Sequence, residues 1–300
     1  TPIKNDTIYL FYHRVAYASK YNIIKNIRNI AKYGTRYEPS YNVGDQISPI
    51  IVAALSNQTV TGVRGKKKGK LLAAGSILGA AKNHDSVWGS GLKWASHATL
   101  VAKARNLNIH AVRGPLTRDA LINAGVECPK VYGNPACLLP ILFPRKIPKK
   151  YKLGIIPHIK HYENFSSLFE HAKANNVLFI SPGMNWVEFI DAITSCDTIA
   201  SSSLHGIIFS ESYGIPSAMF RHETHLGGDS FKFQDYYGSS NRDMTFFESD
   251  LIFDNKFNAI VDLATSVNIP TNDYTNLLEA FPFKVHSQLA VEHCQSRRRP

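Results

Sequence analysis

The chain has 300 residues, of which 44% are hydrophobic and 19% charged, and its formal net charge is +11. This composition is typical of a globular protein with a sizeable core, and the length allows one large domain or two of about 150 residues. No apolar run approaches the roughly 18 residues of a membrane span, and the N-terminus lacks a signal-peptide pattern. The four cysteines have no paired metal-ligand spacing and suit a reducing compartment. We therefore expect a cytoplasmic protein.

The positive charge gathers in three stretches, at residues 64–70, 145–152 and 297–299. None of them has the interleaved aromatic residues or the groove-reading helix of a nucleic-acid module, so we expect no nucleic-acid partner. Attraction to anionic substrates, or peripheral contact with the inner face of an anionic membrane, explains the charge as well. Solvated loops without a partner are the alternative.

Short apolar strands alternate with amphipathic helices before residue 143. Strands are predicted at residues 8–12, 71–74, 86–88 and 109–112. Helices are predicted from residue 42 to about 54 and over residues 114–124, where Pro115 stands in the first turn and Gly125 follows the end. Residues 143–150, rich in proline and lysine and without periodicity, are the predicted linker.

The alternation resumes after the linker. Strands are predicted at residues 153–157, 177–180, 198–200 and 217–220, and helices at 164–174, 186–196 and 272–292, the last kinked or split by Pro282. Strands separated by helices of this length predict parallel sheets with right-handed crossovers. We therefore predict an α/β protein of two Rossmann-like domains, residues 1–145 and 150–300, facing each other across a cleft.

The most informative segment is residues 201–216, which lies between two predicted strands. His205 stands at the opening of a helix, just past the carboxyl end of a strand, and Gly214 and Pro216 supply the helix stop. Open α/β sheets bind anionic ligands at this position, because unpaired backbone N–H groups and the positive helix end converge there. The alternative is a histidine that merely caps or packs.

Residues 202–206, together with Glu211 and residues 214–216, resemble the signature of polysaccharide pyruvyl transferases. Three further segments agree with this family in the expected order: residues 42–45 (Asn-Val-Gly-Asp), the glycine-rich residues 75–78 followed by 87–91, and residues 112–117 around Arg-Gly-Pro. The resemblance implies a glycosyltransferase-B-like fold, with the acceptor on the first domain and the donor on the second. It also implies transfer of pyruvate from phosphoenolpyruvate onto two sugar hydroxyls as a cyclic ketal, in surface or exopolysaccharide biosynthesis.

This reaction needs a proton for the methylene carbon of the enol phosphate, and histidine is the side chain best suited to deliver it near neutral pH. It also needs groups that hold a carboxylate and a phosphate, a task for arginine, backbone N–H groups and a helix end. No step is a redox step or requires a metal. We therefore expect no cofactor beyond the donor substrate.

His205 is the predicted general acid/base. Some family members carry arginine where this chain has Ser203, so another cation must serve, and Arg113 is the strongest candidate. A surface arginine near a helix start is the alternative for Arg113. The other predicted substrate-binding residues are Ser202, Ser203, Gly206, Gly44, Asp45, Gly75, Ser76, His158 and Glu211.

Alternatives stay open for two of these residues. Asp45 either orients substrate or is an N-cap. Glu211 either binds a donor ribose, holds the neighbours of His205, or is solvated. His222 and His225 have His-x-x-His spacing on a predicted loop without further ligands, so no metal site is predicted.

The predicted partners are phosphoenolpyruvate and a sugar acceptor, for which a lipid-linked oligosaccharide is one form. The alternative function is a nucleotide-sugar-dependent glycosyltransferase of the same fold. A carbohydrate-binding or scaffolding protein without activity is a third interpretation. The concentration of His, Arg and Ser at strand ends argues against this third one.

Overall fold

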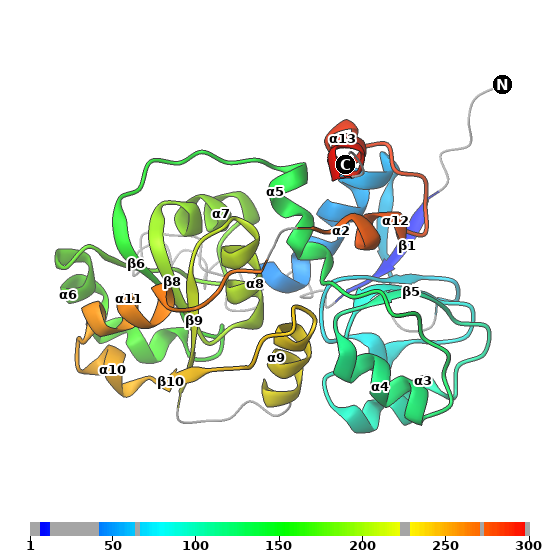
Figure 1. Cartoon of the computed structure of the whole chain (residues 1–300), viewed down its shortest axis with the longest axis horizontal. Helices are drawn as coiled ribbons and strands as arrows, with labels where there is room; N and C mark the ends of the chain where they lie inside the picture. Colours follow the sequence, from blue (N-terminus) through cyan, green and yellow to red (C-terminus); the bar gives the residue numbers. More distant parts are fainter. Residues whose placement is uncertain (1–6, 13–41, 64–66, 223–228, 271–272, 298–300) are drawn as a thin grey trace, which may run out of the picture.

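A computed structural model describes residues 7–12, 42–63, 67–222, 229–270 and 273–297. Two parallel sheets of five strands each form its framework (Figure 1). The strands of the first sheet run in the order β2-β1-β3-β4-β5 and those of the second in the order β10-β9-β8-β6-β7. Every described pairing between neighbouring strands is parallel. The architecture confirms an α/β protein of two Rossmann-like sheets.

The first sheet contains β1 (Ile8–Phe11), β2 (Val60–Val63), β3 (Leu71–Leu72), β4 (Ser86–Ser90) and β5 (Asn108–Val112). The second contains β6 (Tyr151–Ile156), β7 (Val177–Phe179), β8 (Cys196–Ser201), β9 (Ser217–Arg221) and β10 (Phe246–Glu248). The helices of the first half are α2 (Val43–Ser56), α3 (Ala98–Val101), α4 (Pro115–Asn123) and α5 (Leu139–Leu142). Those that follow are α6 (Phe169–Ala174), α7 (Trp186–Thr194), α8 (Leu204–Ser212), α9 (Asp229–Gly238), α10 (Asp250–Phe253), α11 (Phe257–Thr265), α12 (Thr275–Glu279) and α13 (Gln288–Arg297).

The eight predicted strands are all present, with ends shifted by one or a few residues. The sequence patterns missed β2 and β10, which pair on one side only and bury little of their length. The helix predicted at 164–174 is a 3₁₀-helix (Tyr162–Leu168) that continues into α6. The helix predicted at 272–292 is split into α12 and α13, and Pro282 lies in the break.

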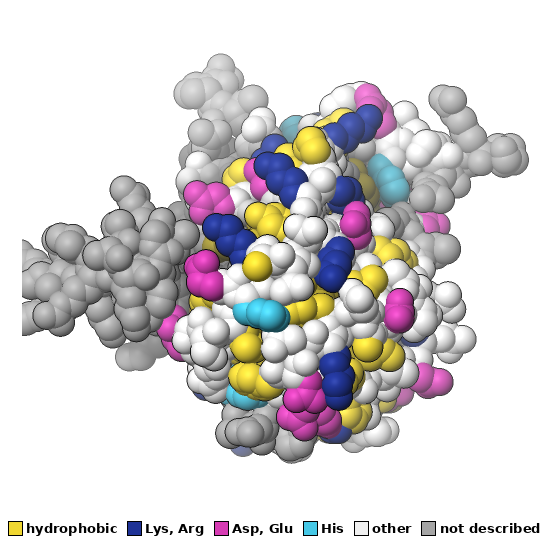
Figure 2. All heavy atoms as spheres, turned by 90° about the vertical axis from the view of Figure 1, so that its left-hand side faces the viewer, with side chains coloured by type: hydrophobic (Ala, Val, Ile, Leu, Met, Phe, Trp, Pro, Cys, Tyr) yellow, Lys and Arg dark blue, Asp and Glu magenta, His cyan; other side chains and the backbone are white. Residues whose placement is uncertain are grey.

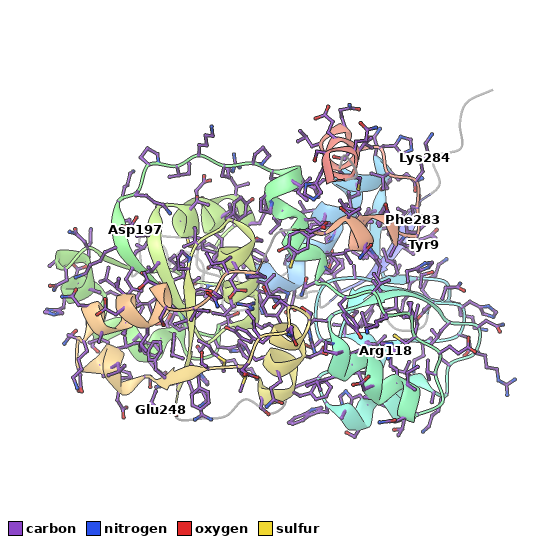
Figure 3. The ribbon with its side chains drawn as sticks, viewed as in Figure 1. Tyr9, Arg118, Asp197, Glu248, Phe283 and Lys284 are labelled. Atoms are coloured by element: carbon purple, nitrogen blue, oxygen red, sulfur yellow. The ribbon has the colours of Figure 1, made fainter. Side chains whose placement is uncertain are left out.

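The last two helices return to the first half of the chain, where they lie beside α2 and β1 (Figure 1). The indole Nε1 of Trp88 in β4 donates to the carbonyl of Leu277 in α12 at 2.8 Å. The backbone N–H of His286 donates to the carbonyl of Leu55 in α2 at 2.7 Å. Figure 3 shows Phe283, between α12 and α13, on the same side of the molecule as Tyr9 of β1. The C-terminal helices therefore pack on elements of the first sheet and on α2, while the bounds of the two domains stay a prediction.

One residue of the three basic stretches is buried. Lys70, at the end of the stretch 64–70, has no exposed surface and pairs with the equally buried Asp85. The carboxylate of Asp85 also accepts from the backbone N–H groups of Lys70 and Lys82, at 3.2 and 2.7 Å. This ion pair fixes the entry to β3 and leaves less free charge than the sequence suggests.

Buried apolar side chains connect the two sheets. The largest cluster joins Leu10 of β1 and Ile47 of α2 with Ile199 of β8 and Ile208 of α8. A second cluster lies around β4 and α3, and a third lies beneath β6 and α11. The first residues of α2 and α8 therefore meet where the shared core approaches the strand ends.

Candidate functional site

Two neighbouring strands of the second sheet deliver predicted site residues to the same edge. His158 follows β6, and Ser202 and His205 follow β8, which pairs with β6. Because parallel strands end at a common edge, these residues come together. The backbone N–H of His158 donates to the Ser202 hydroxyl at 2.9 Å, which ties the two strand ends to each other.

His205 lies against the first turn of α2, so the structure brings two of the family-like motifs into contact. A Cβ atom built on Gly44 would stand 2.1 Å from Nδ1 and 2.3 Å from Cγ of the His205 ring. Only a residue without a side chain leaves room for the imidazole at this point. The ring also makes an edge contact with Phe209, with the ring centroids 6.0 Å apart. The imidazole is therefore held between α2 and its own helix.

The first turn of α2 is fixed from both halves of the chain. Asn42 is the N-cap, and its side chain accepts from the N–H of Gly44 at 3.2 Å. The N–H of Val43 donates to the carbonyl of Pro182, in the loop after β7, at 2.9 Å. Asp45 lies in the first turn as an acidic residue, where it favours the positive helix end. The N-cap interpretation of Asp45 is therefore wrong, and its role toward substrate stays a prediction.

At the start of α8 a second glycine, Gly206, lies very close to a side chain. A Cβ atom on Gly206 would stand 2.3 Å from the hydroxyl oxygen of Ser201. That hydroxyl donates toward the carbonyls of Ile156 and Ser203 and accepts from the N–H of Ser203. Ser203 occupies the N-cap position without a side-chain cap bond. Gly206 therefore shapes the helix start, while contacts of Ser203 and Gly206 with a ligand stay predictions.

Arg113 follows β5 and is fully buried. Its Nε donates to Asp235 at 2.9 Å, one terminal nitrogen donates to the Ser76 hydroxyl at 2.6 Å, and the other donates to the Leu92 carbonyl at 2.7 Å. The surface-arginine alternative is therefore wrong. All three nitrogen atoms hold protein groups, so the geometry favours a positioning role over direct pairing with the donor anion.

The same ion pair ties the Arg-Gly-Pro segment to α9. Besides Arg113, the carboxylate of Asp235 accepts from the backbone N–H of Thr117 at 2.8 Å and from its hydroxyl at 2.6 Å. A Cβ atom on Gly114 would stand 1.8 Å from the carbonyl oxygen of Asp235, so the two backbones nearly touch. Gly75, at φ +115°, accepts from the N–H of Gly91 at 3.0 Å beside this segment.

The ion pair between Arg113 and Asp235 fixes α9, which also carries Lys232, and the charge of Lys232 acts on His205. Lys232 and Asp235 are three residues apart on α9, so their side chains share one face of the helix. Lys232 is partly buried. No motif in the sequence marks this residue, because α9 was not predicted and its charge pattern is ordinary. Neither Lys232 nor Asp235 was therefore predictable from the sequence.

The site is strongly electropositive. Burial and, to a smaller extent, the charges of Lys232 and Arg113 together lower the pKa of His205 to about 3. Burial likewise lowers the pKa of His158 to about 3, assisted by Lys232, His161, Lys160 and Lys93. Within the described residues, the charges that act on both histidines are thus positive. Such an arrangement favours an anion, and with pKa values near 3 both imidazoles are neutral at pH 7.

Hydrogen bonding defines the state of these two rings. Nδ1 of His158 accepts from the backbone N–H of Lys160 at 3.2 Å, which places the proton of the neutral ring on Nε2. Nε2 of His205 is buried and has no hydrogen-bond partner among the described groups. A buried ring nitrogen without a partner costs free energy, and a ligand that bonds to it recovers this cost.

Glu211 does not join this group. It lies in the last turn of α8, is fully buried, and accepts from both terminal nitrogens of Arg242, at 2.9 and 2.7 Å. The hydroxyl of Tyr236 donates to the same carboxylate at 2.7 Å. The solvated interpretation of Glu211 is therefore wrong, and with its oxygens occupied a ribose contact has no support here.

Neither a metal site nor a membrane span emerges from the part of the chain that the structure describes. No three His, Cys, Asp or Glu side chains are grouped there so that they could hold a metal ion. His222 bonds to Ser249 and Asn164, at 2.9 and 3.1 Å, and His225 lies outside the described residues. The described helices are too short or too polar to cross a bilayer.

The contact between Gly44 and His205 makes a direct prediction. Gly44→Ala is expected to leave α2 in place, because alanine is the better helix former, but to push the imidazole out of position. A displacement of about 1 Å at a reacting group costs on the order of a hundredfold in rate. We expect turnover to fall by this amount with unchanged circular dichroism. Near-normal turnover of the folded variant would show that the ring position is unimportant.

Comparisons with known proteins agree with this arrangement. The chain is 31% identical over 167 residues to the uncharacterized protein L143 of Acanthamoeba polyphaga mimivirus. The aligned region covers 54% of this chain and 57% of that relative, so the likeness spans little more than half of either protein. A family model described as polysaccharide pyruvyl transferase matches residues 7–224, which include all four of the segments that resemble this family. The chain therefore belongs to the polysaccharide pyruvyl transferase family.

Proposed function

We propose that the protein transfers pyruvate from phosphoenolpyruvate onto two hydroxyls of a sugar, forming a cyclic ketal and releasing phosphate. The single observation that carries this proposal is the placement of His205. Its imidazole is held between Gly44 and Phe209 in a site whose described charges are positive. A compact donor with a carboxylate and a phosphate is complementary to such a site, and a histidine is the proton donor that its chemistry needs.

The proposed reaction begins with protonation of the donor methylene carbon by the imidazolium of His205, which leaves an oxocarbenium-like centre beside the carboxylate. A sugar hydroxyl adds to this centre and returns its proton to His205. The bond between the former enol carbon and the phosphate oxygen then breaks. The second hydroxyl closes the ring, and its proton leaves with the phosphate. His205 therefore ends in its starting state, and no oxidant or reductant takes part.

Lys232 is the proposed cation in place of the arginine that some family members carry at the position of Ser203. Lys232 shares a face of α9 with Asp235, which pairs with Arg113. Its charge lowers the pKa of both His158 and His205. The three guanidinium nitrogens of Arg113 donate to Asp235, to Ser76 and to the Leu92 carbonyl. The proposed neutral groups that donate hydrogen bonds to phosphoenolpyruvate are Ser202 and Ser203, which follow β8, and His158, which follows β6.

Lys232→Met is accordingly expected to weaken phosphoenolpyruvate binding about tenfold or more, because one hydrogen bond between charged groups contributes on the order of 1.5–3 kcal/mol. Lys173→Met, on the exposed side of α6, is the matched control and should bind like the unmodified protein. Isothermal titration with phosphoenolpyruvate measures both. Equal affinity of the two variants would remove Lys232 from the site.

The function itself is tested by phosphate release from phosphoenolpyruvate with methyl β-galactoside or a mannoside as acceptor. A pyruvyl transferase releases phosphate and adds a ketal to the sugar, which mass spectrometry detects. A protein that ignores phosphoenolpyruvate but hydrolyses or transfers from a nucleotide-sugar would contradict the proposal. A protein that turns over neither donor would be a binding protein.

A cytoplasmic location and a lipid-linked acceptor at the inner face of a membrane remain parts of the proposal. The face seen in Figure 2 carries basic and acidic side chains interspersed, without a field of one sign. A membrane-binding surface is therefore expected on another face. Co-sedimentation with vesicles that contain anionic lipid tests this part independently of the chemistry.

A further inference from the structure

We propose that Lys93, in the loop after β4, is a second cation of the site for phosphoenolpyruvate. Together with Lys232 it gives each of the two anionic groups of the donor a lysine of its own, one from each half of the chain. The inference rests on the proposed function and deepens it. It also changes the expected arrangement, in which the second domain alone holds the donor.

The backbone before Lys93 is fixed by the guanidinium of Arg113. One terminal nitrogen of this group donates to the carbonyl of Leu92 at 2.7 Å. A Cβ atom on Gly91 would stand 2.3 Å from the central carbon of the guanidinium, so a side chain at this position would displace it. The N–H of Leu92 donates in turn to the hydroxyl of Thr117 at 3.1 Å. The loop that carries Lys93 is therefore held at the carboxyl edge of the first sheet.

The helix that carries Lys232 is bonded to the same guanidinium. Nε of Arg113 donates to Asp235 at 2.9 Å, and Asp235 stands one helical turn after Lys232 on α9. The hydroxyl of Thr117 bonds to both segments, since it donates to the Asp235 carboxylate at 2.6 Å and accepts from the backbone N–H of the residue before Lys93. One buried cluster therefore fixes the backbone beside Lys93 and the helix of Lys232 relative to each other.

Both lysines act on the site at the carboxyl edge of the second sheet. Besides burial, which has the largest effect, the charges of Lys232 and Lys93 lower the pKa of His158. Electrostatic interactions weaken with distance, so both lysines lie near this ring. Lys160 also acts on His158, but it is only two residues away in the chain. Lys93 is distant in sequence and comes near His158 only through the fold.

The side chain of Lys93 is accessible to a ligand. It is exposed, and its ammonium lies 6.0 Å from the centroid of the Trp94 ring. None of the ion pairs among the described residues includes it. Phosphoenolpyruvate carries its carboxylate and its phosphate on the same carbon atom. Because a lysine ammonium is a compact point charge, two lysines on different elements suit these two neighbouring groups better than one.

Titration calorimetry with phosphoenolpyruvate tests the role of Lys93. Lys93→Met removes the charge and should weaken binding about tenfold or more. Lys93→Arg keeps the charge and should bind more tightly than Lys93→Met. The matched control is Lys103→Met, at an exposed lysine after α3 that does not act on His158, and it should bind like the unmodified protein. In turnover, Lys93→Met should raise the Michaelis constant for the donor more than it lowers kcat. Equal affinity of Lys93→Met and Lys103→Met would overturn the inference.

A double variant tests whether each anionic group has its own lysine. Substitutions without shared partners have additive effects on the free energy of binding. Lys93→Met combined with Lys232→Met should therefore weaken binding by the product of the single effects, on the order of a hundredfold. A double variant that binds no more weakly than the weaker of the single variants would overturn the assignment, because both lysines would then serve one group. If the proposed function fails, the unmodified protein does not bind phosphoenolpyruvate, whereas failure of this inference alone leaves that binding intact.

Discussion

His205→Ala is expected to lower turnover with phosphoenolpyruvate by on the order of a hundredfold or more, which is the usual contribution of a general acid. The fold should survive, because the ring packs between Gly44 and Phe209 at a helix start and is not enclosed in the core. Phosphate release under saturating donor and acceptor measures the effect. His171→Ala, on the exposed side of α6, is the matched control and should retain full turnover.

His205→Ala is also expected to change the number of protons that the protein takes up when phosphoenolpyruvate binds. In the free protein the pKa of His205 is lowered to about 3, so the ring is neutral at pH 7. A bound donor brings negative charge beside the ring, which favours the imidazolium and raises this pKa. Donor binding should therefore take up protons, and donor affinity should fall as the pH rises through the pKa of the complex.

Titration calorimetry in buffers of different ionisation enthalpy measures this proton uptake. The phosphate of the donor also titrates near neutral pH, so the informative quantity is the difference between the unmodified protein and His205→Ala. We expect the variant to take up fewer protons at pH 7 and to show a flatter dependence of affinity on pH. Identical uptake in both, together with near-normal turnover of the variant, would reduce His205 to a structural residue.

Periodicity in the sequence predicted eight of the ten described strands because each is an apolar run bounded by clear turn signals. It missed β2 and β10 because an edge strand with partly exposed residues has no such run. Helical spacing also predicted helix in the C-terminal segment, but such spacing does not reveal the surface on which a helix packs. The bond from Trp88 to Leu277 spans 189 residues, and no local pattern encodes it.

The site was predictable in part for a similar reason. Glycine and histidine in short motifs marked Gly44, Gly206 and His205, and the structure gives the two glycines physical reasons: close approach to an imidazole and to a hydroxyl. Residues that act through tertiary contacts are not marked by any local pattern in the sequence. Lys232 and Asp235 matter because α9 docks against the Arg-Gly-Pro segment, which is a property of the folded chain.

Arg113 is the residue whose interpretation changes most. The sequence predicts that Arg113→Ala raises the Michaelis constant for the donor. The structure predicts a larger effect on stability, because the guanidinium and its partner Asp235 are both fully buried. Removing one member of a buried ion pair leaves the other charge uncompensated and costs about 3–5 kcal/mol. For a chain of this size the midpoint of thermal unfolding should fall by on the order of 10 °C.

Three comparisons separate stability from donor binding. Arg118→Ala removes a partly exposed arginine of α4, seen in Figure 3, that pairs loosely with Asp119, and it should change the midpoint little. Arg113→Lys should recover little, because an ammonium cannot reach Asp235, Ser76 and the Leu92 carbonyl together. Arg113→Met combined with Asp235→Asn should regain part of the lost stability, since no buried charge then remains unpaired. If Arg113→Ala instead unfolds like the unmodified protein and binds phosphoenolpyruvate weakly, Arg113 contacts the donor directly, and the ion pair with Asp235 must open when the donor binds.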